Sequence, residues 1–225
     1  MSLQLDDFLI TGRTFDEYAA FFNLNIADLI DKKILDCPSG ASSFVAEAQS
    51  KGLNTKACDI LYQFEIDKIY ARGKKSIELI YKDISWAAEN DFNFYGSIEN
   101  HRQHRENALA NFYSHYNDKD YLFTTLPELP FEDDSFDLIL SSHLLFVYDD
   151  RLDLDFHIKS IESMLRVAKE VRIFPLVDYK NSRVKLQDNF SPFVPEIMKT
   201  FGATLEKVNF EFQKGADMMI KIVKS

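Results

Sequence analysis

A strand, a tight loop, a helix and a second strand follow one another early in this 225-residue chain, and this order constrains the fold more than any other feature. The strands are expected at residues 33–37 and 53–58, ending at Pro38 and Asp59, with the helix at residues 43–51 between them. A unit of this kind, about 30 residues long, sets two parallel strands side by side through a right-handed crossover. The pattern therefore predicts an α/β fold built on a parallel sheet.

The alternation of strands and helices resumes in the second half of the chain. Further strands are predicted at residues 120–125, 136–140, 170–176, 204–212 and 218–223, and helices at residues 153–168 and 191–201. The last two strands are joined by a short polar link at residues 213–215. Strands joined in this way pair antiparallel. We therefore expect a mostly parallel sheet that ends in an antiparallel hairpin.

Residues 60–118 interrupt this alternation with segments rich in aromatic and charged residues. Helices are predicted there at residues 61–71, 75–89 and 102–116. The segment is too long for an ordinary crossover, so we interpret it as a helical insertion after the second strand. We expect the whole chain, 1–225, to form a single domain.

The N-terminal part, residues 1–31, is predicted to form one or two helices within residues 14–30. Thr14 is the expected N-cap, and Glu17 completes a capping box three residues later. Residues 1–18 carry early acids and no long apolar run, so no signal peptide is expected. No stretch of about 18 apolar residues occurs, so no membrane helix is expected.

Charge and cysteine content narrow the classes of partner and the compartment. The chain has 26 basic and 36 acidic residues, a net charge of −10. Such a surface repels nucleic-acid phosphates and anionic lipid, so we expect neither as a partner. Two cysteines, Cys37 and Cys58, cannot build a disulfide framework. We expect a reduced, cytoplasmic protein with small buried cysteines.

Residues that follow the strands are the first candidates for a site, because ligands of open parallel sheets lie beyond the carboxyl ends of the strands. The chain has only seven glycines, and Gly40 lies in the loop of residues 36–42, where its backbone can approach a ligand. Asp59 follows the second strand, at the position where an acid bonds ribose hydroxyls in nucleotide-binding sheets. A plain turn glycine and a solvated loop acid fit the same pattern, so the loop alone leaves both interpretations open.

Three stretches together are more specific: ILDCPSGASSF (34–44), KACDI (56–60) and LPELPFEDDSFDLILSSHLLFVYDD (126–150). They resemble the class I S-adenosylmethionine-dependent methyltransferases. The resemblance covers residues 30–60 and 120–225 and leaves the insertion unmatched. Inserted helices usually roof the site in this fold, so the resemblance implies that residues 60–118 act as a lid. It implies a Rossmann-like, mostly parallel seven-stranded sheet with an antiparallel terminal hairpin and helices on both faces. It also implies S-adenosyl-L-methionine as the cofactor.

The resemblance further implies which residues contact the cofactor. They are Asp36, Pro38, Ser39, Gly40, Ser42, Asp59, Thr125, Leu126 and Ser141. Of the family's three loop glycines only Gly40 is kept, with Pro38 and Ser42 at the other two positions. Thr125 stands where many members carry an acid that binds adenine. These departures leave open a non-catalytic member of the fold.

Other candidate residues rest on their chemistry. His143, after the fourth strand, is the candidate catalytic base, because an imidazole titrates near neutrality; a purely structural wall or cap is the alternative. Arg13 and Tyr18 are candidates to close over the cofactor's carboxylate, with ordinary surface placement as the alternative. His101 and His104 are spaced to share a metal, but without a third ligand we expect a solvated helix face and no metal site.

We therefore expect a methyltransferase that acts on a small or medium-sized acceptor, either a small molecule or a protein side chain. A non-catalytic, cofactor-binding or regulatory member of the same fold is the first alternative. A nicotinamide-dependent oxidoreductase is a weaker one, since the terminal hairpin distinguishes this sheet from the nicotinamide-binding arrangement. The oligomeric state is open.

Overall fold

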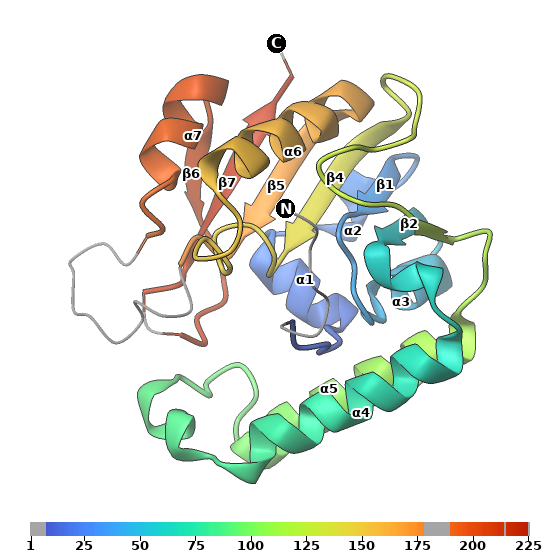
Figure 1. The fold of residues 1–225 in the computed structure, drawn as a ribbon, viewed down its shortest axis with the longest axis vertical. Helices are drawn as coiled ribbons and strands as arrows, with labels where there is room; N and C mark the ends of the chain where they lie inside the picture. The colour runs from blue at the N-terminus through green and yellow to red at the C-terminus, as the bar shows by residue number, and fades with distance from the viewer. Residues whose placement is uncertain (1–7, 178–189, 214, 225) are drawn as a thin grey trace.

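One seven-stranded sheet organises the molecule, which we describe from a computed structural model over residues 8–177, 190–213 and 215–224 (Figure 1). The strand order is β3-β2-β1-β4-β5-β7-β6. The strands are β1 (Lys33–Asp36), β2 (Asn54–Asp59), β3 (Tyr121–Phe123), β4 (Phe136–Ser142), β5 (Ala168–Phe174), β6 (Thr204–Lys207) and β7 (Met218–Val223). β7 alone runs antiparallel to its neighbours β5 and β6. The predicted mostly parallel sheet with an antiparallel terminal hairpin is confirmed.

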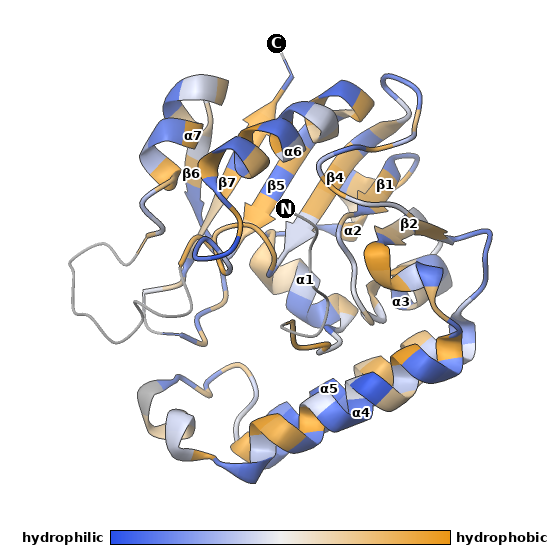
Figure 2. Cartoon of the chain, viewed as in Figure 1, coloured by the Kyte–Doolittle hydropathy of each residue, from blue (hydrophilic) through white to orange (hydrophobic). Residues whose placement is uncertain are grey.

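Successive residues of the central strands point into two different cores. Ile34 and Leu138 pack with aromatic side chains from α1, α3 and α5, whereas Leu35 and Ile139 pack with α6 and α7. Side chains alternate across a strand, so apolar residues at neighbouring positions require helices on both faces. Figure 2 shows the result, with β4 largely hydrophobic between amphipathic helices.

Two helices precede β1, and the others occupy connections between the strands. The helices are α1 (Phe15–Phe21), α2 (Ile26–Leu29), α3 (Phe44–Ser50), η2 (Ile60–Gln63), α4 (Ile66–Lys82), η3 (Ser85–Glu89), α5 (Ile98–His115), α6 (Leu154–Val167) and α7 (Val194–Phe201). Within the described part of the chain, none of these helices has the length and hydrophobicity needed to span a bilayer.

The insertion between β2 and β3 forms a long arm of two paired helices, α4 and α5 (Figure 1). The predicted break between helices 61–71 and 75–89 is wrong, because α4 continues through Gly73. A Cβ atom at Gly73 would lie 2.6 Å from Cδ1 of Leu109 on α5. Gly73 therefore serves the close packing of the two helices and does not end one of them. The other predicted helix, 102–116, begins earlier, at Ile98, where Ser97 is the N-cap.

The segment that follows β6 also differs from its prediction. The strand expected at residues 204–212 ends at Lys207, and the following residues leave the sheet. Val208 and Phe210 are buried, and Phe212 stacks on the ring of His101 with centroids 4.6 Å apart. Contacts with the insertion thus replace strand pairing here. Lys214, part of the predicted link, lies outside the described residues.

The N-terminal segment is fixed by its capping box and by one close approach. The backbone N–H of Thr14 donates to Glu17 (2.8 Å), and the N–H of Glu17 donates to the hydroxyl of Thr14 (3.4 Å), which confirms the predicted cap of α1. Just before it, Gly12 passes between α5 and the loop after β1. A Cβ atom on Gly12 would lie 2.6 Å from the carbonyl oxygen of Ala41 and 2.9 Å from Cβ of Ala108.

Candidate functional site

A cavity of about 950 Å³ lies where the carboxyl ends of the parallel strands meet. Its walls include the residues directly after β1, β2, β3, β4 and β5: Cys37, Ile60, Thr124, His143 and Pro175. The strand order reverses between β1 and β4, since the chain runs outward through β2 and β3 and then returns to the other side of β1. The cavity therefore occupies the position at which open α/β sheets bind ligands.

The insertion and the N-terminal segment complete the walls of this cavity. Leu79, Trp86, His101 and Arg105 face it from the helical arm, and Phe8 to Thr11 and Arg13 face it from the N-terminal segment. Phe210 and Phe212 contribute from the stretch after β6. One half of the cavity is thus built by the edge of the sheet, and the other half by the insertion, the N-terminal segment and the stretch after β6.

The loop after β1 is held by the end of β2. The Asp59 carboxylate accepts the N–H of Gly40 through Oδ2 (2.7 Å) and the N–H of Leu61 through Oδ1 (2.8 Å). The Tyr62 hydroxyl donates to the carbonyl oxygen of Gly40 (2.8 Å). Gly40 has a φ of +62°, which L side chains rarely adopt, and a Cβ there would meet no atom within 4 Å. The loop therefore has a fixed shape and an open face at Gly40.

Two hydroxyls near this loop lack hydrogen-bond partners within the described residues. They are Oγ of Ser39, which lines the cavity, and Oγ of Ser141, which lies buried at the end of β4. Buried polar atoms are nearly always paired in folded proteins. Since Ser39 faces the cavity, its unpaired hydroxyl indicates a place where a polar ligand atom can bind.

The carboxyl of Asp36 is sealed behind Tyr18. The Tyr18 hydroxyl donates to both carboxyl oxygens, at 2.9 and 3.0 Å. Asp36 is 0% exposed, and burial raises its pKa to about 8, although the hydrogen bond from Tyr18 opposes this shift. Burial also raises the pKa of Asp59, to about 6, against the two backbone N–H groups that favour its charged form. At neutral pH, Asp59 is therefore the charged member of this pair.

His143 occupies a strained backbone position at the end of β4. Its φ is +56°, and its Nδ1 lies 2.6 Å from Oγ of Ser142. Its ring packs against Phe21 and Phe174, with centroids 5.2 and 5.8 Å away. Burial, and then the charge of Arg13, hold the pKa of His143 well below its ordinary value. The imidazole lining the cavity is therefore neutral at pH 7, and it is a weaker base than an exposed histidine. Non-glycine residues at positive φ often mark functional positions.

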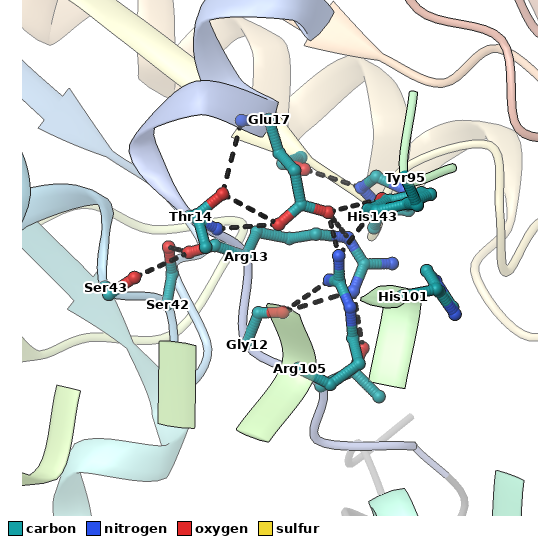
Figure 3. A network of polar contacts seen from close by, with 12 residues as sticks. Gly12, Arg13, Thr14, Glu17, Ser42, Ser43, Tyr95, His101, Arg105 and His143 are labelled. Atoms are coloured by element: carbon teal, nitrogen blue, oxygen red, sulfur yellow. Dashed lines mark hydrogen bonds and ion pairs between the residues drawn. The ribbon is translucent and has the colours of Figure 1, made fainter. Parts of the chain in front are cut away.

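A buried ion pair joins the N-terminal helix to the insertion (Figure 3). Arg105 of α5 binds Glu17 of α1 and the carbonyl oxygen of Gly12, and both charged side chains are almost fully buried. The Tyr95 hydroxyl also donates to Glu17, at 2.6 Å. Arg13 lies beside this pair, with its Nε 3.8 Å from the Glu17 carboxylate.

Sequence reasoning did not select Arg105, although a signal was present. Arg105 precedes Ala108 and Leu109 by three and four residues and Phe112 by seven, so it occupies the apolar face of its helix. A charged residue on an apolar face requires a buried partner. The partner, Glu17, lies 88 residues away and was assigned only to the capping box.

The structure brings most of the predicted site residues to the cavity. Pro38, Ser39, Gly40, Asp59, Thr125, Leu126 and His143 line it, as do Arg13 and Tyr18. Asp36, Ser42 and Ser141 lie buried behind this lining. The hydroxyl of Ser42 donates to the carbonyl oxygen of Arg13 (2.8 Å) and accepts the N–H of Phe44 (3.1 Å), so it ties the start of α3 to the N-terminal segment.

The solvated helix face expected for His101 is wrong. His101 is 7% exposed, its Nδ1 lies 2.6 Å from the Tyr81 hydroxyl, and its ring stacks on Phe212. Burial lowers its pKa to about 3. His101 thus belongs to an aromatic wall of the cavity, because the segment after β6 folds over the insertion at this point.

Comparison with known proteins places the chain among relatives of unassigned activity. No protein-family model matches the sequence. The uncharacterized protein MJ0045 of Methanocaldococcus jannaschii is 35% identical over 224 residues, which covers 98% of each chain.

Solved structures with related architecture include two S-adenosylmethionine-dependent methyltransferases. The Aquifex aeolicus enzyme has 14% identity and a TM-score of 0.43, with 93% of each chain covered. The Methanosarcina mazei protein has 14% identity and a TM-score of 0.42, with 86% of this chain and 91% of that chain covered. The sheet order with its antiparallel β7 matches the arrangement that the sequence resemblance implies, and the chain belongs to one family with MJ0045.

Proposed function

We propose that this protein transfers a methyl group from S-adenosyl-L-methionine to a small or medium-sized acceptor bound in the cavity. The observation that carries the proposal is the contact of Asp59 with Gly40, at 2.7 Å, beside that cavity. It fixes the loop after β1 against the end of β2, at the edge of the sheet where nucleotides bind in this class of fold. The sequence resemblance over residues 34–60 and 126–150 supports the same assignment.

The residues present fit this cofactor. The open face at Gly40 leaves room for a ligand against the loop, and the unpaired hydroxyl of Ser39 offers it a hydrogen bond. Each Asp59 oxygen accepts one backbone N–H and keeps a second lone pair, which a ribose hydroxyl would occupy. Thr125 and Leu126, after β3, would border the base.

The bound cofactor would supply a methyl group activated by its positively charged sulfur: a lone pair of the acceptor would bond to the methyl carbon in line with the carbon–sulfur bond, which would break and leave its electrons on the sulfur. The chain must align the acceptor with that methyl group and exclude water. Where the acceptor atom carries a proton, His143 would take it, because its imidazole lines the cavity; its lowered pKa makes it a weak base, so it serves an acceptor proton that becomes acidic as the new bond to carbon forms. The hydrogen bond between Ser142 and Nδ1 of His143 fixes the ring's orientation.

Calorimetric titration with S-adenosylhomocysteine tests the assignment. We expect binding to the wild-type protein, and an affinity loss of about 1–3 kcal/mol in Asp59→Asn, since the amide nitrogen replaces an oxygen that accepts hydrogen bonds. Asp155→Asn on α6, whose side chain is 69% exposed, removes the same charge far from the loop and should leave the affinity unchanged. No binding to the wild-type protein, with binding of a nicotinamide dinucleotide instead, would overturn the proposal.

Catalysis is tested separately from binding. Wild-type protein incubated with methyl-labelled cofactor and a small-molecule extract should release S-adenosylhomocysteine and label an acceptor. Binding of the cofactor without any label transfer, to small molecules or to protein, would favour the non-catalytic alternative.

A further inference from the structure

Two guanidinium groups face one carboxylate in the wall of the cavity, although the chain as a whole carries a net charge of −10. Arg13 and Arg105 both line the cavity, and Glu17 is the acid beside them. Among the described residues, the ion pairs of both arginines go to this one side chain. Arg13, Arg105 and Glu17 together therefore carry one more positive charge than negative charge.

Glu17 has no capacity left to neutralise a second cation. Its side chain is fully buried and accepts hydrogen bonds from the N–H and hydroxyl of Thr14, from Tyr95 and from Arg105. Arg13 is only a distant partner, at 3.8 Å. Its Nη1 donates to the Thr11 hydroxyl (3.0 Å) and to the carbonyl oxygen of Gly12 (3.3 Å), neither of which is charged.

Each arginine has an N–H donor without a hydrogen-bond partner among the described residues. Nη2 of Arg13 makes no hydrogen bond to any described residue, and Nε of Arg105, which is buried, has no partner there either. Arg105 is 1% exposed, so water does not compensate its unpaired N–H. An anion bound at Nη2 of Arg13 would use the donor that this side chain leaves free.

The other acids around the cavity do not supply that anion. Asp36 is closed off behind Tyr18, and Asp59 is held by the N–H groups of Gly40 and Leu61. Asp83, at the far end of α4, is exposed to solvent and binds the N–H of Ser85. The positive charge at Arg13 therefore remains available to a ligand.

Arg13 points toward the half of the cavity built by the insertion. Its carbonyl oxygen is bound by the N–H of Ser43 (3.0 Å) and the hydroxyl of Ser42 (2.8 Å), so the backbone is fixed at the start of α3. From there the side chain runs away from the loop, toward Arg105 and Tyr95 (Figure 3). After burial, the charge of Arg13 is the next cause that lowers the pKa values of His101 and His143, which both line the cavity.

An aromatic wall stands on the same side. The rings of His101 and Phe212 are stacked at 4.6 Å, and Trp86 packs against both, at 5.8 and 6.0 Å. All three residues line the cavity. They offer flat, largely apolar surfaces to the body of a ligand, whereas Arg13 offers it a charge.

We propose that the methyl acceptor is a small organic anion with a planar, apolar body, whose carboxylate or equivalent group binds Nη2 of Arg13 while its body lies against Trp86, His101 and Phe212. This inference rests on the proposed function. A carboxylate on the cofactor would have the same chemistry as one on the acceptor, so the experiment has to distinguish these two sources.

The test is calorimetric titration of the protein saturated with S-adenosylhomocysteine. The probes are benzoate, phenylacetate and 3-phenylpropionate, each beside its uncharged carboxamide. We expect at least one carboxylate to bind at least tenfold more tightly than its amide, and Arg13→Gln to remove this preference. Arg13→Lys keeps the positive charge but loses the planar guanidinium group with its paired N–H donors, so it should retain part of the preference for the carboxylate. Arg102→Gln, which removes a 48% exposed guanidinium from α5, should retain all of it.

Three results would overturn the inference. They are equal binding of every carboxylate and its amide, a preference that survives Arg13→Gln, and a tenfold or greater loss of S-adenosylhomocysteine affinity in Arg13→Gln, which would assign Arg13 to the cofactor. A protein that binds no S-adenosylhomocysteine at all would instead refute the proposed function. Thermal denaturation of each variant confirms that the arginine substitutions leave the protein folded.

Discussion

Glu17 and Arg105 form an ion pair that excludes water and joins α1 to the inserted helix α5 across 88 residues of sequence. Both side chains are buried, at 0% and 1% exposure. Through the carbonyl oxygen of Gly12, Arg105 also holds the segment that carries Arg13. The position of the Arg13 guanidinium in the cavity wall thus depends on the contacts of Arg105 with Glu17 and Gly12, which lie outside the sheet.

Removal of Arg105 should destabilise the protein strongly. In Arg105→Met, Glu17 remains buried without its cation, and breaking such a pair costs about 3–5 kcal/mol. Urea unfolding measures this loss. The double variant Glu17→Gln/Arg105→Met should recover part of it, because no charge is then left buried. If the single variant loses less than about 1 kcal/mol, the ion pair is not the main connection between α1 and α5.

A methyl group at Gly12 should displace the N-terminal segment. The added Cβ would lie 2.6 Å from a backbone oxygen, that of Ala41, and 3.2 Å from the backbone nitrogen of Leu109, so neither neighbour can rotate away. We expect Gly12→Ala to lose about 1–3 kcal/mol of stability. Unfolding by urea, followed through the fluorescence of Trp86, measures it. An unchanged midpoint would mean that the segment is not packed this closely.

Stability should fall as the pH rises because of Asp36. Its pKa is about 8 in the folded protein and about 3.8 when unfolded, so the folded state binds more protons between these values. The free energy of unfolding therefore decreases with rising pH over this window, by at most about 1.4 kcal/mol per pH unit. Asp36→Asn keeps an oxygen that accepts the Tyr18 hydrogen bond and removes the titration.

The measurement is urea unfolding of both proteins at pH 6 and pH 8. The difference in stability between Asp36→Asn and wild type should grow in favour of the variant as the pH rises. This comparison cancels the contributions of Asp59 and the histidines, which both proteins share. A constant difference would show that Asp36 does not titrate in this range.

Gly40→Ala should lower the affinity for S-adenosylhomocysteine beyond what its loss of folding stability explains. The positive φ of Gly40 costs alanine about 1–2 kcal/mol, and the new methyl group would occupy the open face of the loop. Gly52→Ala is a matched control, because Gly52 has a φ of +82° and equal free space but does not line the cavity. Both variants should lose similar stability, and only Gly40→Ala should lose affinity. Equal affinities would place the ligand elsewhere.

Local signals were sufficient to predict the sheet and its loop. The strand, loop and helix of residues 33–51 are specified by a short apolar run, small residues and a helix start within a few positions of one another. The capping box of Thr14 and Glu17 is local in the same way. Such signals survive in a single sequence because their partners lie within one turn or one connection.

Features that depend on distant partners could not be predicted in this way. Gly73 looks like a helix stop until Leu109 is known to pack on it. Phe210 and Phe212 fit a strand by alternation, but aromatic contacts with the insertion draw their segment out of the sheet. His101 looks like a surface histidine for the same reason. In each case tertiary packing outweighed local propensity.

The close passage of Gly12 between the loop after β1 and α5 has a consequence for biosynthesis. During translation, residues 8–14 leave the ribosome long before Arg105 and Ala108, against which they pack. The segment around Gly12 therefore cannot settle until the insertion has emerged and paired. The wall that carries Arg13 is thus completed late, and a nascent chain stopped before residue 105 would hold a partial sheet without a closed binding chamber.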